Sequence, residues 1–138
     1  MQATVKWIDG VMFVGDSGSG HAVVMDGPPD HGGRNMGFRP MEMLLLGVGG
    51  CSSFDVVQIL QKGRHDIVKC VAEVTAERVD AVPSVFSKMH LHFIVSGHNL
   101  PTSAVERAVM LSAEKYCSAS IMLSKAVEIT HDFEVIEV

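Results

Sequence analysis

The chain has 138 residues, a net charge of −5, 47% hydrophobic residues and 20% charged residues. This length predicts one domain over residues 1–138 that buries a core without disulfides. The composition excludes a disordered chain, and the acidic charge argues against nucleic-acid and membrane partners. Residues 1–10 lack the basic and apolar parts of a targeting segment, so we expect a cytoplasmic protein whose three cysteines form no structural disulfides.

Residues 2–26 are predicted to form three short antiparallel strands. Polar and apolar residues alternate from Thr4 to Trp7, and Asp9-Gly10 is a typical hairpin turn. Residues 27–40 are rich in glycine and proline and are expected to form a loop. A loop of this length is usually functional or mobile.

Residues 40–62 are predicted to form a long helix, because proline is favoured at a first helical position and Gly63 at a helix end. Apolar residues cover nearly all faces of this helix, and a helix of that kind is buried. One small domain cannot surround it, so we expect a second subunit to cover part of it. The interior glycines 47, 49 and 50 cost about 1 kcal/mol each in a helix, and close approach of a backbone or a ligand would compensate.

The second half of the chain is predicted to begin with strands over 66–80 and 87–97. A helix follows Pro101, with Ser103 and Glu106 at capping-box spacing or Thr102 as the N-cap, and Ser118 is expected to cap a further helical turn through Leu123. The last strand is expected over 126–137. The order βββ-α-ββ-α-β groups the strands, which predicts the α+β class with antiparallel sheets.

Three cysteines are the first candidates for chemistry. Cys51 and Cys117 are far apart in sequence, so only the fold can bring them together. Cys70 lies in an alternating strand and is expected to be a packing residue. Free cysteine is among the most buried residue types, so packing is an alternative for Cys51 and Cys117 as well.

Two segments resemble the OsmC/Ohr family. Residues 39–60, RPMEMLLLGVGGCSSFDVVQIL, are similar to the central helix of that family, in which a proline and a glutamate precede an apolar run, small residues and a cysteine. The matching residues in order are Pro40, Glu42, Leu44, Leu45, Gly49, Gly50 and Cys51. Residues 113–123, AEKYCSASIML, resemble the second cysteine segment, and the ending CSxxDVVxIL is similar to the bacterial YhfA-like branch.

This resemblance implies an intertwined homodimer with long central helices and with its sites at the subunit interface. It also implies a thiol peroxidase in which Cys51 reduces an organic hydroperoxide and Cys117 resolves it, in defence against oxidative stress. A dithiol such as a dihydrolipoyl group would supply the electrons. No metal and no organic cofactor are expected.

The family resemblance also points to Glu42 as a site residue. It precedes Cys51 by nine positions, which places it on the opposite face of the helix about 13.5 Å along the axis. It would therefore act across the dimer or through an intermediary. The alternative is an acid of the first turn that stabilises the helix dipole. The family's activating arginine comes from the N-terminal strands, but residues 1–33 contain none; Arg34 and Arg39 are the remaining candidates.

Two other functions stay open at this point. One is a non-catalytic protein that binds a small molecule or senses redox state on the same scaffold. The other is metal binding by His90 and His92, which share a strand face; no third ligand is obvious, so polar exposure is the preferred interpretation.

Overall fold

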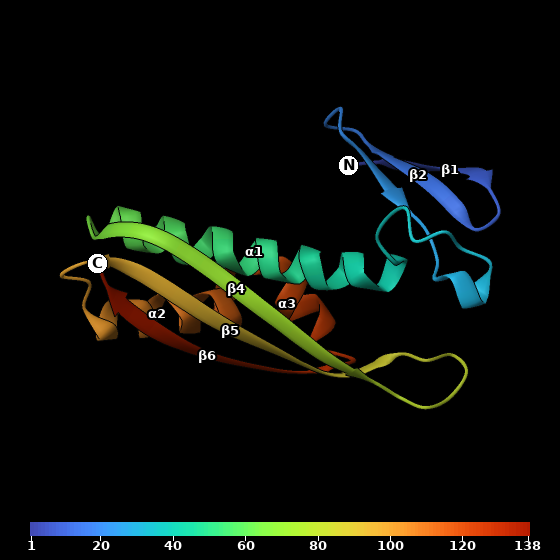
Figure 1. Ribbon diagram of the computed structural model, residues 1–138. Helices are drawn as coiled ribbons and strands as arrows, with labels where there is room; N and C mark the ends of the chain where they lie inside the picture. The colour runs from blue at the N-terminus through green and yellow to red at the C-terminus, as the bar shows by residue number, and fades with distance from the viewer. The chain divides into compact units, whose positions relative to one another are not determined.

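The computed structural model describes residues 1–138, the whole chain, and has the predicted order of elements (Figure 1). Its contacts divide the chain into two compact units, Met1–Leu44 and Leu45–Val138, and the α1 helix begins in the first and continues into the second. The elements in chain order are β1 (Ala3–Asp9), β2 (Met12–Ser17), β3 (Ala22–Met25), the 3-10 turn η1 (Pro29–His31), α1 (Pro40–Lys62), β4 (Asp66–Arg78), β5 (Phe86–His98), α2 (Thr102–Leu111), the π-helical turn η2 (Ser112–Tyr116), α3 (Ser118–Leu123) and β6 (Glu128–Glu137).

The first unit contains the antiparallel sheet β1-β2-β3 and the loop that follows it. Gly10 has the positive φ of 54° that the predicted hairpin turn requires. The loop is organised by the buried Asp26 carboxylate, which accepts hydrogen bonds from the backbone N–H groups of Gly27, Arg34 and Met36 at 2.8, 3.1 and 3.2 Å. Because three backbone N–H groups donate to this one carboxylate, the glycine-rich loop adopts a defined path.

The second unit contains the sheet β4-β5-β6, and one of its strand pairs corrects the expectation of antiparallel sheets. β4 and β5 are antiparallel, whereas β6 runs parallel to β5. A parallel neighbour needs a crossover connection, and the segment 99–127, which contains α2 and α3, supplies it. The α+β class is confirmed, with a mixed second sheet.

The core of the second unit lies between one face of this sheet and the helices, which are behind the sheet in Figure 1. β5 alternates as predicted, with Leu91 and Phe93 fully buried and His90 and His92 on the other face. Gly49 of α1 lies against β4, because a Cβ at this position would come within 2.9 Å of a Val74 methyl group. The expected close approach is therefore present at Gly49, while a Cβ at glycine 47 or 50 would meet open space.

The α1 helix buries one face within this chain, not all of them. Its buried residues are Val48, Gly49, Ser52, Val56 and Leu60. Leu46 and Phe54 are 52% and 64% exposed. By length and composition α1 is the one helix apolar enough to cross a membrane, a test that core helices of soluble proteins also pass. The apolar surface outside the buried face has no covering partner in one chain.

The start of α2 differs from the predicted capping box. Pro101 is the N-cap, with extended backbone, and no side chain caps the helix. Thr102 and Ser103 are therefore the first two helical residues. Their hydroxyls cannot serve as the N-cap, because the N-cap is the last residue before the helix.

Candidate functional site

Cys51 and Cys117 belong to neighbouring segments of the second unit. Cys51 is a half-buried residue of α1, and Cys117 is completely buried between η2 and α3. The hydroxyl of Ser52, the residue after Cys51, donates a hydrogen bond of 3.1 Å to the Cys117 sulfur. Both cysteines are free thiols. The fold thus brings together two segments that the sequence separates by 65 residues.

The local backbone explains how Cys117 is held. α2 ends in the π-helical turn η2, and the Cys117 N–H donates to the Ser112 carbonyl oxygen at 2.9 Å. Cys117 itself is extended, and its sulfur accepts the backbone N–H of Ser120 at 3.3 Å, so that it is the N-cap of α3. This corrects the prediction that Ser118 caps this helix. The cap is the thiol one residue earlier.

A second serine ties η2 to α1. The Ser112 hydroxyl donates to the Asp55 carboxylate at 3.1 Å and lies 3.4 Å from the Ser52 carbonyl oxygen. Ser112 and Ser52 are both almost fully buried. Sequence analysis did not identify Ser52, Ser112 or Ser120, because serines near a cysteine carry no motif; their role depends on the contact between α1 and η2.

The surroundings of Cys117 favour its protonated form. Burial raises the pKa of the Cys117 thiol, and the neighbouring Cys51 thiol raises it further through hydrogen bonding and charge. The hydrogen bonds from Ser52 and from the Ser120 N–H act in the opposite direction and lower this pKa, but the net shift is upward. Cys70 is a half-buried residue of β4 whose pKa is also raised by burial. Cys117 is therefore a buried proton-carrying thiol, and Cys51 is the more accessible member of the pair.

The predicted cations and acid belong to the first unit. Arg34 forms an exposed ion pair with Asp9 at 3.0 Å, and the Arg39 guanidinium donates to the Gly37 carbonyl at 3.2 Å. The Glu42 carboxylate accepts the backbone N–H of Arg39 at 2.9 Å, which is the capping contact of a third helical residue. The first-turn role of Glu42 is thus present. The catalytic roles of Glu42, Arg34 and Arg39 stay predictions.

The outward face of the second sheet carries a group of polar side chains that sequence analysis only partly identified. Asp132 Oδ1 lies 2.9 Å from His90 Nε2 and 2.6 Å from His92 Nδ1. The His92 hydrogen bond, together with His90, holds the pKa of Asp132 below its ordinary value. Asp132 was missed because the parallel pairing of β6 with β5, which places it opposite His92, was not expected.

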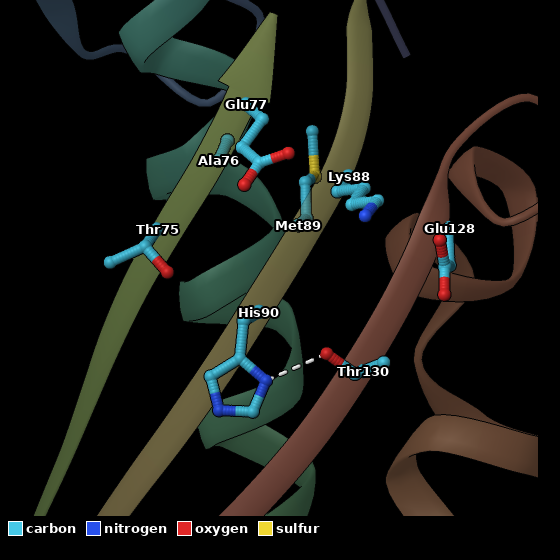
Figure 2. Close-up of a pocket in the computed structure, with 8 residues that line it drawn as sticks. All are labelled: Thr75, Ala76, Glu77, Lys88, Met89, His90, Glu128 and Thr130. Carbon is cyan, nitrogen blue, oxygen red and sulfur yellow. Dashed lines mark hydrogen bonds between the residues drawn. The ribbon is translucent and has the colours of Figure 1, made fainter.

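Figure 2 shows a hollow beside this group on the same sheet. The hydrogen bond of 2.7 Å between His90 Nδ1 and Thr130 Oγ1 borders it, and α1 lies behind the strands. Its lining residues are Thr75, Ala76, Glu77, Lys88, Met89, His90, Glu128 and Thr130. Six of these eight lining residues are polar or charged.

Comparison with known proteins gives a consistent family and fold. A family model described as OsmC-like protein matches residues 31–132. Protein YhfA of Escherichia coli (strain K12) is 53% identical over 139 residues, covering 99% of this chain and 98% of that protein. The crystal structure of a hypothetical protein from Aquifex aeolicus is similar with a TM-score of 0.87 and 25% identity, covering 99% and 96% of the two chains.

A more distant structure carries a functional name. It is the organic hydroperoxide resistance protein OsmC from Legionella pneumophila, with a TM-score of 0.70, 12% identity and 97% of both chains covered. At this identity the likeness establishes a shared fold.

Proposed function

Because the chain belongs to the OsmC-like protein family, we propose that it is a thiol-dependent peroxidase that reduces organic hydroperoxides through Cys51 and Cys117. The observation that carries this proposal is the junction between the two cysteine segments, where Ser52 donates to the Cys117 sulfur at 3.1 Å. The hydroperoxide-resistance name of the Legionella pneumophila structure supports the same substrate class. The role would be defence against oxidative stress in the cytoplasm.

The two thiols divide the reaction between them. The Cys51 thiolate attacks one peroxide oxygen, the O–O bond breaks, and the alkoxide takes a proton and leaves as an alcohol, so that Cys51 becomes a sulfenic acid. Cys117 then attacks the Cys51 sulfur, water leaves, and a disulfide forms. A dithiol such as a dihydrolipoyl group reduces this disulfide by exchange and is itself oxidised to a disulfide.

The different exposure of the thiols supports this assignment. Reactive cysteines are partly exposed, as Cys51 is, whereas a buried thiol with a raised pKa is a poor first nucleophile. A disulfide requires a Cα separation of about 4.4–6.8 Å, and we predict that Cys51 and Cys117 come within this range while Cys70 stays outside the reaction.

The activating groups are proposed to come from the first unit of a partner subunit. Arg39 is the better candidate of the two arginines, because its guanidinium donates only to a carbonyl group while Arg34 is paired with Asp9. A guanidinium near Cys51 would stabilise the thiolate and donate to the peroxide. Glu42, which already contacts the Arg39 backbone, would orient it.

This arrangement requires an intertwined homodimer of single OsmC-like domains. The exposed apolar residues Leu46 and Phe54 of α1 and Trp7 of β1 support it, since a partner subunit would remove them from water. Sedimentation at micromolar protein concentration should give a dimer. A folded monomer under these conditions would contradict the arrangement.

The test of the activity is consumption of cumene hydroperoxide with dihydrolipoamide as the reductant. We expect turnover by the wild type, loss of turnover in Cys51→Ser, an accumulated Cys51 sulfenic acid in Cys117→Ser, and unchanged turnover in the matched control Cys70→Ser. Mass spectrometry of the oxidised wild type should identify the Cys51–Cys117 disulfide. No consumption by folded, fully reduced wild type would overturn the proposal.

The second candidate is a protein that binds a small molecule or senses redox state without turnover. The absence of arginine from residues 1–33 favours it. In that case peroxide would oxidise Cys51 only slowly, and the dithiol would not increase the total amount of peroxide consumed.

A further inference from the structure

Three side chains on the outward face of the second sheet converge on one point. The ligand-type atoms of His90, His92 and Asp132 all lie within 4.8 Å of one another. We propose that these three residues bind a divalent first-row transition metal ion, for which Zn²⁺ is the probe. This site is separate from the thiol pair and does not depend on the peroxidase proposal.

The strand geometry builds the cluster. His90 and His92 are two residues apart on β5, so both side chains leave the same face of the sheet. β6 is parallel to β5 in a register that places Thr130 beside His90 and Asp132 beside His92. All four side chains therefore stand on paired strands within a hydrogen-bonded sheet, which fixes their backbone positions.

Each imidazole ring has one nitrogen toward Asp132 and the other toward an oxygen atom. His90 Nε2 faces Asp132, while its Nδ1 lies 2.7 Å from the Thr130 hydroxyl. His92 Nδ1 faces Asp132, while its Nε2 lies 3.7 Å from a Glu134 carboxylate oxygen. Histidines that bind metals usually donate their second N–H to such an oxygen, which directs the lone pair of the other nitrogen to the ion.

The ligand chemistry selects the type of ion. Two imidazoles and one carboxylate are typical of zinc and related transition metals, whereas calcium and magnesium prefer oxygen ligands. Bond lengths near 2.0–2.1 Å would place the ligand atoms about 3.4 Å apart around a tetrahedral ion. Asp132 Oδ1 lies 2.9 Å from His90 Nε2 and 2.6 Å from His92 Nδ1. A small increase in these two distances would let the ion bind among the three atoms.

The site is also accessible and coordinatively open. The side chains of His90, His92 and Asp132 are 39%, 31% and 59% exposed, so an ion can enter from solvent. Three protein ligands leave at least one position for water or another ligand. The hollow in Figure 2 lies beside His90 and is lined by Lys88, Glu128 and Thr130. A water molecule or another ligand at the open coordination position could occupy this hollow.

The neighbouring strand pair of the same sheet, β4 and β5, provides a matched control. His98 Nδ1 lies 2.9 Å from Asp66 Oδ2, so this pair has the same type of histidine–carboxylate hydrogen bond. It is not part of a group of three ligand atoms. If one histidine–carboxylate pair were sufficient to bind the ion, substitution of His98 would weaken binding as much as substitution of His90.

The experiment is calorimetric titration of Zn²⁺ into the reduced full-length protein and into a Cys51→Ser/Cys117→Ser form that removes thiol ligands. We expect one ion per chain in both. His90→Ala, His92→Ala and Asp132→Asn should each weaken binding more than about tenfold, Thr130→Val about tenfold, and His98→Ala not at all. Unfolding midpoints of all variants identify any that fail to fold.

Two spectroscopic measurements identify the ligand atoms. Nitrogen NMR of the histidine side chains should shift His90 Nε2 and His92 Nδ1 on addition of Zn²⁺ and leave His98 unchanged. Co²⁺ bound to the Cys51→Ser/Cys117→Ser form, which keeps Cys70, should give a spectrum with no sulfur charge-transfer band. Absence of stoichiometric binding by the wild type would overturn the proposal. So would binding by folded His90→Ala and His92→Ala that is as tight as binding by the wild type.

Discussion

The Asp26 carboxyl and the Cys117 thiol are both buried polar groups, but their pKa values shift in opposite directions. Burial by itself would raise the pKa of Asp26, but hydrogen bonds from the backbone N–H groups of Gly27, Met36 and Arg34, together with the Arg34 charge, hold it below its ordinary value. Burial also raises the pKa of Cys117, and there the Ser52 hydroxyl and a single backbone N–H do not compensate, since the Cys51 thiol adds to the increase.

Hydrogen-bond donors around a buried acid can therefore outweigh burial and reverse the direction in which its pKa shifts. Asp26 has three backbone donors and remains an anion that organises the loop after β3. Cys117 has two donors, the Ser52 hydroxyl and the Ser120 N–H, and its pKa stays raised. A protonated, buried Cys117 suits the second step of the proposed reaction, in which a thiol waits for a sulfenic acid to form on Cys51.

The largest effect on stability is expected from removing the Cys117 acceptor. Cys117→Val keeps the site apolar but leaves the Ser52 hydroxyl and the Ser120 N–H buried without a partner. Two unsatisfied donors should lower the free energy of unfolding by about 2–4 kcal/mol. Urea unfolding at fixed protein concentration measures this value.

Cys70→Val is the matched control for that measurement. Cys70 is half-buried on β4 and its sulfur takes part in no hydrogen bond. A change of about 1 kcal/mol or less is expected. Equal destabilisation by the two substitutions would show that the hydrogen bonds to Cys117 contribute nothing to stability.

An intermediate effect is expected for Asp26→Asn, and it should depend on pH. Asn has one acceptor oxygen, so it cannot replace both Asp26 oxygens, one of which accepts from Gly27 and the other from Arg34 and Met36. Because the pKa of Asp26 is lower in the folded chain, its stabilising contribution is present above the unfolded value of about 3.9 and is lost as the pH falls below it.

The measurement is the free energy of unfolding of both proteins across the acidic range. The wild type should be the more stable at pH 6, and the difference should shrink as the pH falls below about 4. A difference that does not change with pH would mean that the charge of Asp26 has no role. Faster amide exchange at Arg34 and Met36 in Asp26→Asn would locate the effect in the loop.

A smaller effect is expected for Ser52→Ala. This substitution removes one donor to Cys117 but leaves the Ser120 N–H in place, so the loss of stability should be about 1 kcal/mol. The pKa of Cys117 should rise further, because the Ser52 hydrogen bond lowers it. The pH dependence of alkylation of Cys117 in a Cys51→Ser background measures this, and Ser53→Ala is the control. A downward shift would contradict the role assigned to Ser52.

The elements of this fold were largely predictable, because they depend on local signals. Pro40 and Gly63 mark the ends of α1 as predicted, and the alternation in β5 gives the correct buried face. The Cys117 cap of α3 was not predictable, since it depends on a π-helical turn that extends the end of α2. Sequence spacing could not give the third ligand of the histidine pair either, because Asp132 reaches His92 only through the parallel register of β6.

The smallest change in stability is expected for Glu42→Gln, and it separates two roles of this residue. As a cap, Glu42 accepts the Arg39 N–H from an exposed position, and Gln can make the same contact. The lost charge near the helix N-terminus should therefore lower the free energy of unfolding by only about 0.3–1 kcal/mol. As an orienting group for an arginine of the peroxidase site, Glu42 needs its negative charge. We then expect hydroperoxide turnover to fall at least tenfold while the unfolding midpoint hardly moves, with Glu114→Gln, an acid of η2, as the control. Unchanged turnover in Glu42→Gln would leave Glu42 as a helix cap alone and would remove it from the proposed site.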